Sequence, residues 1–94
     1  AAAAGDFVTV LYNPRSKQRS GHIARAVQIF LQHRRGATPV ALVRNCSRPG
    51  EETVLTTLQD MLGHPIDMLT TVIIGNSLTF VAGGRMVTPR GYGL

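Results

Sequence analysis

The sequence predicts a small α/β domain, with a mixed sheet of about five strands and flanking helices. Short runs rich in Val, Ile and Leu recur along the 94 residues, and one segment between two such runs shows helical spacing. Turn-forming residues separate these segments. Hydrophobic residues make up 44% of the chain and aromatic residues only 5%, so we expect a core of aliphatic side chains.

The first part of the chain is predicted to form one β-α-β unit. Residues 7–12 are nearly continuous apolar and β-branched, and Asn13-Pro14 ends this strand because proline restricts the residue before it. Apolar residues then recur at helical spacing between Ser20, the expected N-cap, and Gly36, the expected stop. Residues 39–43 form the second strand. Such a unit normally makes a right-handed crossover between parallel strands.

The rest of the chain is predicted to contain two more strands, a short helix and a hairpin. In order, we expect a turn at 44–50, a strand at 52–58, a short helix at 59–62, a strand at 70–74 and a turn at 75–77. Runs at 79–82 and 85–89 flank Gly83-Gly84, which is a good hairpin signal. Residues 90–94 are expected to be a loose tail. The domain is expected to span 6–94, with 1–5 a linker or tag remnant.

Positive charge is concentrated in the first half of the chain. Residues 1–50 hold eight of the ten Lys and Arg against one acid, Asp6, and this suits an anionic partner such as nucleic acid or a polycarboxylate small molecule. Cys46 is the single cysteine, which excludes an internal disulfide, and on pattern alone it is expected to be a semi-buried thiol. No signal peptide or membrane-length apolar run is present, so we expect a cytoplasmic protein.

Small polar residues follow three of the predicted strands. They are Asn13-Pro14, Asn45-Cys46-Ser47 and Gly75-Asn76-Ser77. In an open α/β sheet, ligands sit beyond the carboxyl ends of the strands, so parallel first and second strands would bring the first two turns to one edge, where backbone amides can read a flat heterocycle. The alternative, which the pattern alone favours, is that these residues only make turns. Arg15 directly follows the first turn and is best placed to bind a carboxylate.

No residue pattern indicates a catalytic group. The chain lacks the glycine-rich dinucleotide motif, the Walker A motif and the nucleophile elbow. His22, His33 and His64 do not have metal-ligand spacing, so no metal site is expected. Asp60 and Asp67 do not form a carboxylate pair in the predicted elements. If this domain serves an enzyme, it therefore contributes binding and orientation.

Longer segments of the sequence resemble one known family. The segments LYNPRS at 11–16, MLTTVIIGNS at 68–77 and GGRMVTPRGY at 83–92 form a specific combination, supported by 39–45 and 55–58. They resemble the precorrin-3B C17-methyltransferases of cobalamin biosynthesis, within the tetrapyrrole methylase family. The resemblance runs in order and at natural spacing from Asp6 to Tyr92.

The resemblance implies a larger protein than this chain. Members of the family have two α/β domains, with S-adenosylmethionine between them and a GxGPG-type loop in the N-terminal domain. Such a loop is not found in this sequence, so the chain is expected to be the C-terminal domain alone, inactive without its N-terminal partner. The implied reaction is methyl transfer to C17 of precorrin-3B with ring contraction, which leaves S-adenosylhomocysteine. A homodimer is implied for the full-length protein.

The resemblance also implies roles for particular residues. The adenosyl part of the cofactor is contacted, largely through backbone, near Tyr12-Asn13, Asn45-Cys46-Ser47 and Leu69-Thr70, and Arg15 is the preferred contact for a carboxylate of the tetrapyrrole. The hypothesis from another class is a stand-alone basic module that binds nucleic acid or dimerises. The paucity of aromatic residues for base stacking counts against nucleic acid, and no membrane partner is expected.

Overall fold

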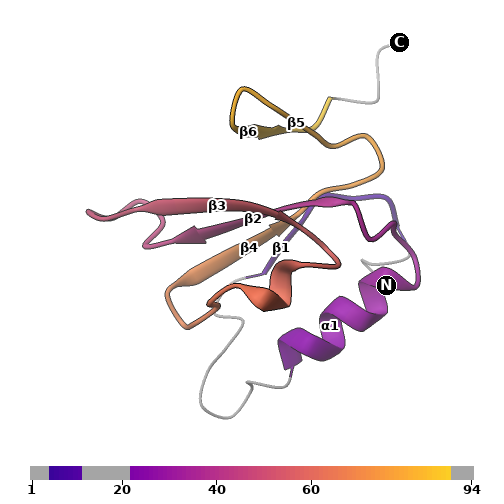
Figure 1. Cartoon of the computed structure of the whole chain (residues 1–94), viewed down its shortest axis with the longest axis horizontal. Helices are drawn as coiled ribbons and strands as arrows, with labels where there is room; N and C mark the ends of the chain where they lie inside the picture. The colour runs from indigo at the N-terminus through magenta and orange to yellow at the C-terminus, as the bar shows by residue number, and fades with distance from the viewer. Residues whose placement is uncertain (1–4, 12–21, 90–94) are drawn as a thin grey trace.

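The computed structural model describes residues 5–11 and 22–89, and these form two small sheets and one α-helix (Figure 1). The elements in chain order are β1 (Thr9–Leu11), α1 (His22–Leu31), β2 (Pro39–Arg44), β3 (Glu52–Thr57), the 3-10 helix η1 (Met61–Gly63), β4 (Thr70–Ile74), β5 (Phe80–Ala82) and β6 (Arg85–Val87). The α/β class predicted from the sequence is confirmed.

The main sheet has the strand order β1-β4-β2-β3, and β5-β6 form a separate two-stranded sheet. Every strand pair in the described chain is antiparallel, whereas the sequence predicted a mixed sheet. The reason is that β4 lies between β1 and β2 and runs opposite to both. The two strands of the predicted β-α-β unit therefore point the same way, as expected, but they do not pair with each other.

Helix α1 packs against one face of the main sheet because its apolar residues form a single stripe. Ile23, Val27 and Phe30 are buried, one turn apart, while Arg25 and Gln28 between them are exposed. The helix ends at Leu31, before the predicted stop at 36. The chain continues in turns after Leu31, beginning with backbone hydrogen bonds back to residues 29 and 30.

The core between helix and sheet is aliphatic apart from one phenylalanine, in agreement with the composition. Strand β2 contributes Val40 and Leu42, and β4 contributes Val72 and Ile74, all nearly fully buried. The segment after β3 closes this core with three further buried side chains, Leu58, Met61 and Ile66. The short helix predicted at 59–62 is a 3-10 helix at Met61–Gly63.

The hairpin of β5 and β6 lies on the opposite side of the sheet from α1 (Figure 1). It turns at Gly83 and Gly84, whose φ angles of 58° and 73° suit a type I′ turn and confirm the predicted hairpin. A shallow hollow of about 490 Å³ separates the hairpin from sheet residues such as Ala41 and Ile73. Among the described residues, no helix is long and apolar enough to span a membrane.

Candidate functional site

Strand β4 runs antiparallel to β2, and this decides which loops meet at each end of the strands. Arg44 at the end of β2 pairs with Thr70 at the start of β4, and the Asn45 amide donates to the Leu69 carbonyl at 3.0 Å. The turn after β2 therefore adjoins the start of β4. The turn that begins at Gly75 lies at the opposite end of these strands, where the Gly75 N–H donates to the Pro39 carbonyl at 2.9 Å. It cannot share a site with the Asn45 turn.

These two adjoining segments border a hollow of about 190 Å³. It is lined by Asn45, Cys46, Arg48, Met68, Leu69, Thr70 and Thr71. Four residues predicted to contact the cofactor, Asn45, Cys46, Leu69 and Thr70, are thus brought to one place. Sequence reasoning missed Arg48, Met68 and Thr71, which lie within two residues of predicted positions.

The remaining predicted site residues stand apart from this hollow. Ser47 belongs to the same turn as Cys46 but does not line the hollow. Tyr12, Asn13 and Arg15 lie outside the described residues. Their predicted contacts with the cofactor and the tetrapyrrole therefore stay predictions.

The turn after β2 has an unusual backbone. Asn45 and Ser47 have φ angles of 54° and 62°, in the left-handed region that L-residues seldom adopt. Side chains hold this shape: the Asn45 amide group donates to the Gly50 carbonyl at 3.5 Å, and Glu51 Oε1 accepts from the Ser47 N–H at 3.0 Å. Cys46, between the two, is exposed, so the expectation of a semi-buried thiol is wrong.

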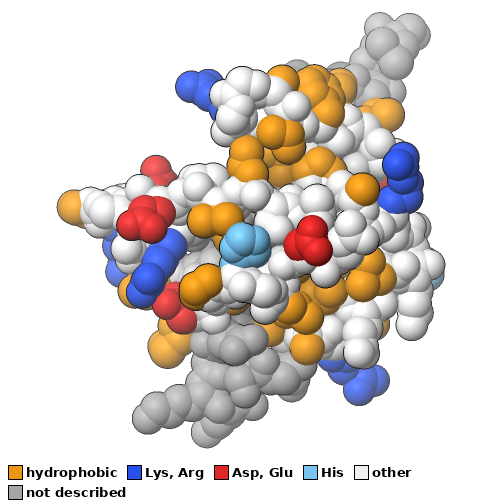
Figure 2. All heavy atoms as spheres, in the orientation of Figure 1, with side chains coloured by type: hydrophobic (Ala, Val, Ile, Leu, Met, Phe, Trp, Pro, Cys, Tyr) orange, Lys and Arg blue, Asp and Glu red, His pale blue; other side chains and the backbone are white. Residues whose placement is uncertain are grey.

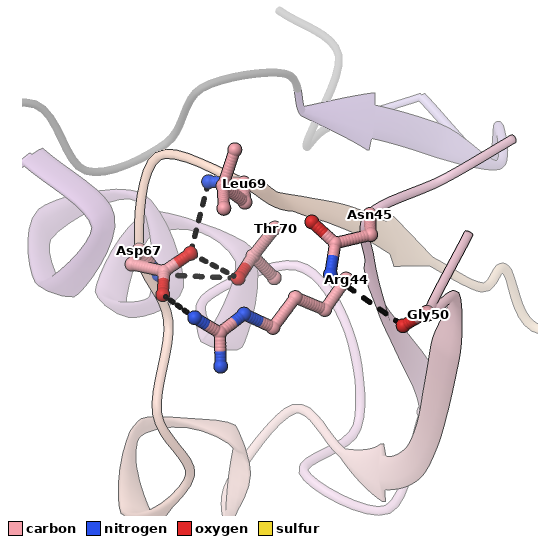
Figure 3. A network of polar contacts seen from close by, with 6 residues as sticks. All are labelled: Arg44, Asn45, Gly50, Asp67, Leu69 and Thr70. Carbon is pink, nitrogen blue, oxygen red and sulfur yellow. Dashed lines mark hydrogen bonds and ion pairs between the residues drawn. The ribbon is translucent and has the colours of Figure 1, made fainter. Parts of the chain in front are cut away.

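The second border of the hollow is shaped by Asp67 (Figure 3). Asp67 Oδ1 accepts from the Leu69 N–H at 2.9 Å and from the buried Thr70 hydroxyl at 3.2 Å, and Thr70 Oγ1 in turn accepts from the Asp67 N–H at 3.1 Å. Asp67 Oδ2 lies 3.1 Å from Arg44 Nη2. Sequence reasoning assigned no role to Asp67, although an Asp three residues before a Thr is a known signal for side chains that bond a local turn.

The described arginines include two with partners inside the fold. Figure 2 shows Arg side chains at separate places on the face in view, and hydrophobic side chains over the hairpin at the top. Two arginines have structural partners: Arg44 binds Asp67, and Arg34 donates to the Gly75 and Gly5 carbonyls at 2.7 and 2.9 Å. Both side chains therefore already have partners within the fold.

A second hollow, of about 270 Å³, lies at the opposite edge of the sheet beside Asp6. The hydroxyl of Ser77 donates to one Asp6 carboxylate oxygen and its N–H to the other, and these bonds hold the pKa of Asp6 below its ordinary value of 3.8. Desolvation opposes this lowering of the Asp6 pKa, and the nearby Arg34 guanidinium adds a smaller effect in the lowering direction. These contacts tie the segment before β1 to the loop after β4, which is a structural role.

The structure is a small α/β fold with a hollow between the turn after β2 and the start of β4, and comparison with known proteins shows what it is similar to. No family model matches the chain. It is 52% identical over 92 residues to "Cobalt-factor III methyltransferase" from Priestia megaterium, covering 98% of this chain and 17% of that protein. It is 49% identical over 94 residues to "Probable cobalt-factor III C(17)-methyltransferase" from Salmonella typhimurium, covering 100% of this chain and 39% of that protein.

A solved structure shares the fold. The crystal structure of the methyltransferase CobJ superposes with a TM-score of 0.82 at 31% sequence identity, covering 94% of this chain and 37% of that one. Over nearly its whole length the chain is therefore similar to a part of proteins that are named as methyltransferases of cobalt-factor III, and the resemblance found in the sequence is confirmed. It spans well under half the length of each of these relatives.

Proposed function

We propose that this chain is the C-terminal domain of an S-adenosylmethionine-dependent methyltransferase that acts on C17 of a corrin precursor in cobalamin biosynthesis. The observation that carries the proposal is the meeting of two segments, at Asn45-Cys46 and Leu69-Thr70, which the sequence places far apart and the fold joins in one hollow. The similarity along nearly the whole chain to proteins named as probable C17-methyltransferases supports it.

The residues of the hollow fit one side of an adenosyl group. Met68 and Leu69 supply exposed apolar side chains against which a flat heterocycle can pack, and the turn at Asn45 and Cys46 supplies backbone polar groups beside them. The hollow is open on one side, as expected for half of a site whose other wall comes from the N-terminal domain. When bound there, the cofactor supplies an already activated methyl group.

Binding and orientation are the work we assign to this domain. Holding a donor methyl group and an acceptor carbon in line converts an encounter between two molecules into a step within one complex, and that alone removes a large part of a barrier. This accounts for a site wall without a predicted nucleophile or general base. Arg15 is proposed to bind a carboxylate of the tetrapyrrole. The left-handed turn at 45–47 is proposed to hold the backbone of Cys46 in place for the adenosyl group.

The names of the relatives support one form of the tetrapyrrole. Both relatives at about half identity are named for cobalt-factor III. We therefore propose the cobalt-containing substrate in place of the cobalt-free precorrin-3B. The full-length protein is proposed to be a cytoplasmic homodimer.

Calorimetry with S-adenosylhomocysteine tests the shared site. We expect the full-length protein to bind this product at micromolar or tighter dissociation constants and the 94-residue chain to bind it at least about a hundredfold more weakly, because one wall is missing. Equally tight binding by the isolated chain would overturn the two-walled site. Failure of the full-length protein to bind would overturn the proposed activity.

A further inference from the structure

The ion pair between Arg44 and Asp67 joins the two borders of the hollow without lining it (Figure 3). Arg44 is the last residue of β2, directly before the turn at Asn45, and Asp67 precedes Leu69 and Thr70 at the start of β4. The Arg44 and Asp67 side chains are 52% and 45% exposed. They can therefore affect the positions of the residues that line the hollow without contacting a ligand in it.

Asp67 uses its two carboxylate oxygens for different tasks. Oδ1 accepts from the Leu69 N–H and the Thr70 hydroxyl, which fixes the local turn. Oδ2 binds Arg44 at 3.1 Å and so fixes that turn relative to β2. The Asn45 N–H to Leu69 carbonyl bond then sets the spacing between the two borders.

We propose that Arg44 and Asp67 are positioning residues for the adenosyl group of the cofactor, and the inference rests on the function proposed above. A site read largely through backbone groups depends on where two loops sit relative to each other, since displacements well under 1 Å weaken such binding. The ion pair sets that relation. Because the pair is half exposed, it contributes little to the stability of the fold. Removing it should therefore leave the domain folded, so that a change in binding can be measured.

Arg44 has another acidic neighbour, and this provides a matched control. Glu52 is the partner of Arg44 across the β2–β3 ladder, yet the ion pair runs to Asp67. Asp67→Asn and Glu52→Gln each remove one negative charge close to Arg44 and keep the size of the side chain. The Asn oxygen also still accepts the Leu69 N–H. The two variants thus separate the ion pair from general charge effects.

The test measures S-adenosylhomocysteine dissociation constants of full-length variants by calorimetry. We expect Asp67→Asn and Arg44→Gln each to weaken binding by roughly three- to tenfold, and the double variant to be no weaker than the worse single variant, because the two residues act as a unit. Arg44→Lys should recover most of the loss, and Glu52→Gln should bind like the unsubstituted protein. The KM for S-adenosylmethionine should rise with the dissociation constant while kcat changes less.

Thermal unfolding separates positioning from general damage. The midpoint of Asp67→Asn should stay within about 4 °C of the unsubstituted protein. Unchanged affinity in both single variants, additive losses in the double variant, or a loss of affinity matched by a large fall in midpoint would each overturn the positioning role. No binding by the unsubstituted protein would instead overturn the proposed function, so the two failures are distinguishable.

Discussion

At the scale of single residues, the ionisation of Asp6 is coupled to folding. Hydrogen bonds from Ser77 lower the pKa of Asp6 in the folded chain below its ordinary value of 3.8, so the stabilisation is fully present above that value and is lost as the pH falls through the lower, folded pKa. We expect Asp6→Asn to lower the melting temperature near pH 7 and to have a much smaller effect near pH 2, as measured by circular dichroism.

The matched control for Asp6 is Glu52→Gln, which removes a carboxylate exposed on β3. Its melting temperature should follow that of the unsubstituted protein at both pH values. An Asp6→Asn deficit of equal size in acid and at neutral pH would show that the lost interaction does not depend on the charge of Asp6.

Residue roles that depend on distant partners could not be predicted from the sequence. In the sequence nothing distinguishes Arg34 from its neighbour Arg35. The bonds from Arg34 to the Gly5 and Gly75 carbonyls depend on the fold, which brings these distant residues together. Asp67 is different, because its bonds to Leu69 and Thr70 are local, and the three-residue spacing between Asp67 and Thr70 can be read from the sequence. What was not visible is that Arg44 would lie beside it.

At the scale of elements, the helix and sheet are held together by side chains that alternate along β4. Thr70, Val72 and Ile74 face α1, and Ile74 is fully buried among aliphatic neighbours. We expect Ile74→Ala to lower the free energy of unfolding by about 2–5 kcal/mol, because it removes buried methylene and methyl groups and leaves a cavity. Denaturant unfolding followed by circular dichroism measures this change.

The same substitution on the outer side of α1 serves as the comparison. Ile29 is 41% exposed, and Ile29→Ala should cost about 1 kcal/mol or less, since little apolar surface is buried there and alanine favours the helix. Equal losses at Ile74 and Ile29 would contradict the placement of the core between α1 and β4.

Element positions were more predictable than their pairing. The apolar, β-branched runs set β2 and β4 to within a residue, and Gly83-Gly84 set the hairpin, because these signals are local. The insertion of β4 between β1 and β2 depends on contacts between distant segments, which local periodicity does not encode. That insertion is also what brings Leu69 to Asn45 and creates the hollow.

At the scale of the whole molecule, charge distinguishes the two ligands of the proposed site. The chain carries a formal net charge of +5, which attracts a tetrapyrrole fringed with carboxylates and has little net effect on zwitterionic S-adenosylhomocysteine. In the full-length enzyme, the KM for the tetrapyrrole should rise roughly two- to tenfold between about 0.05 and 0.5 M salt, as screening weakens the attraction, while the S-adenosylhomocysteine dissociation constant changes less than about twofold.

Steady-state kinetics and calorimetry over one salt series measure both quantities, with S-adenosylhomocysteine as the internal reference. Equal salt dependence of the two ligands would contradict a role for the net charge in substrate capture. A duplex or single-stranded oligonucleotide in the same series tests the remaining alternative, since binding to nucleic acid by charge falls steeply and linearly on a logarithmic salt scale. Among the described arginines, Arg44 is paired with Asp67 and Arg34 is bonded to backbone carbonyls, so fewer positive side chains are available for the phosphates of a nucleic acid, and this favours the small polycarboxylate.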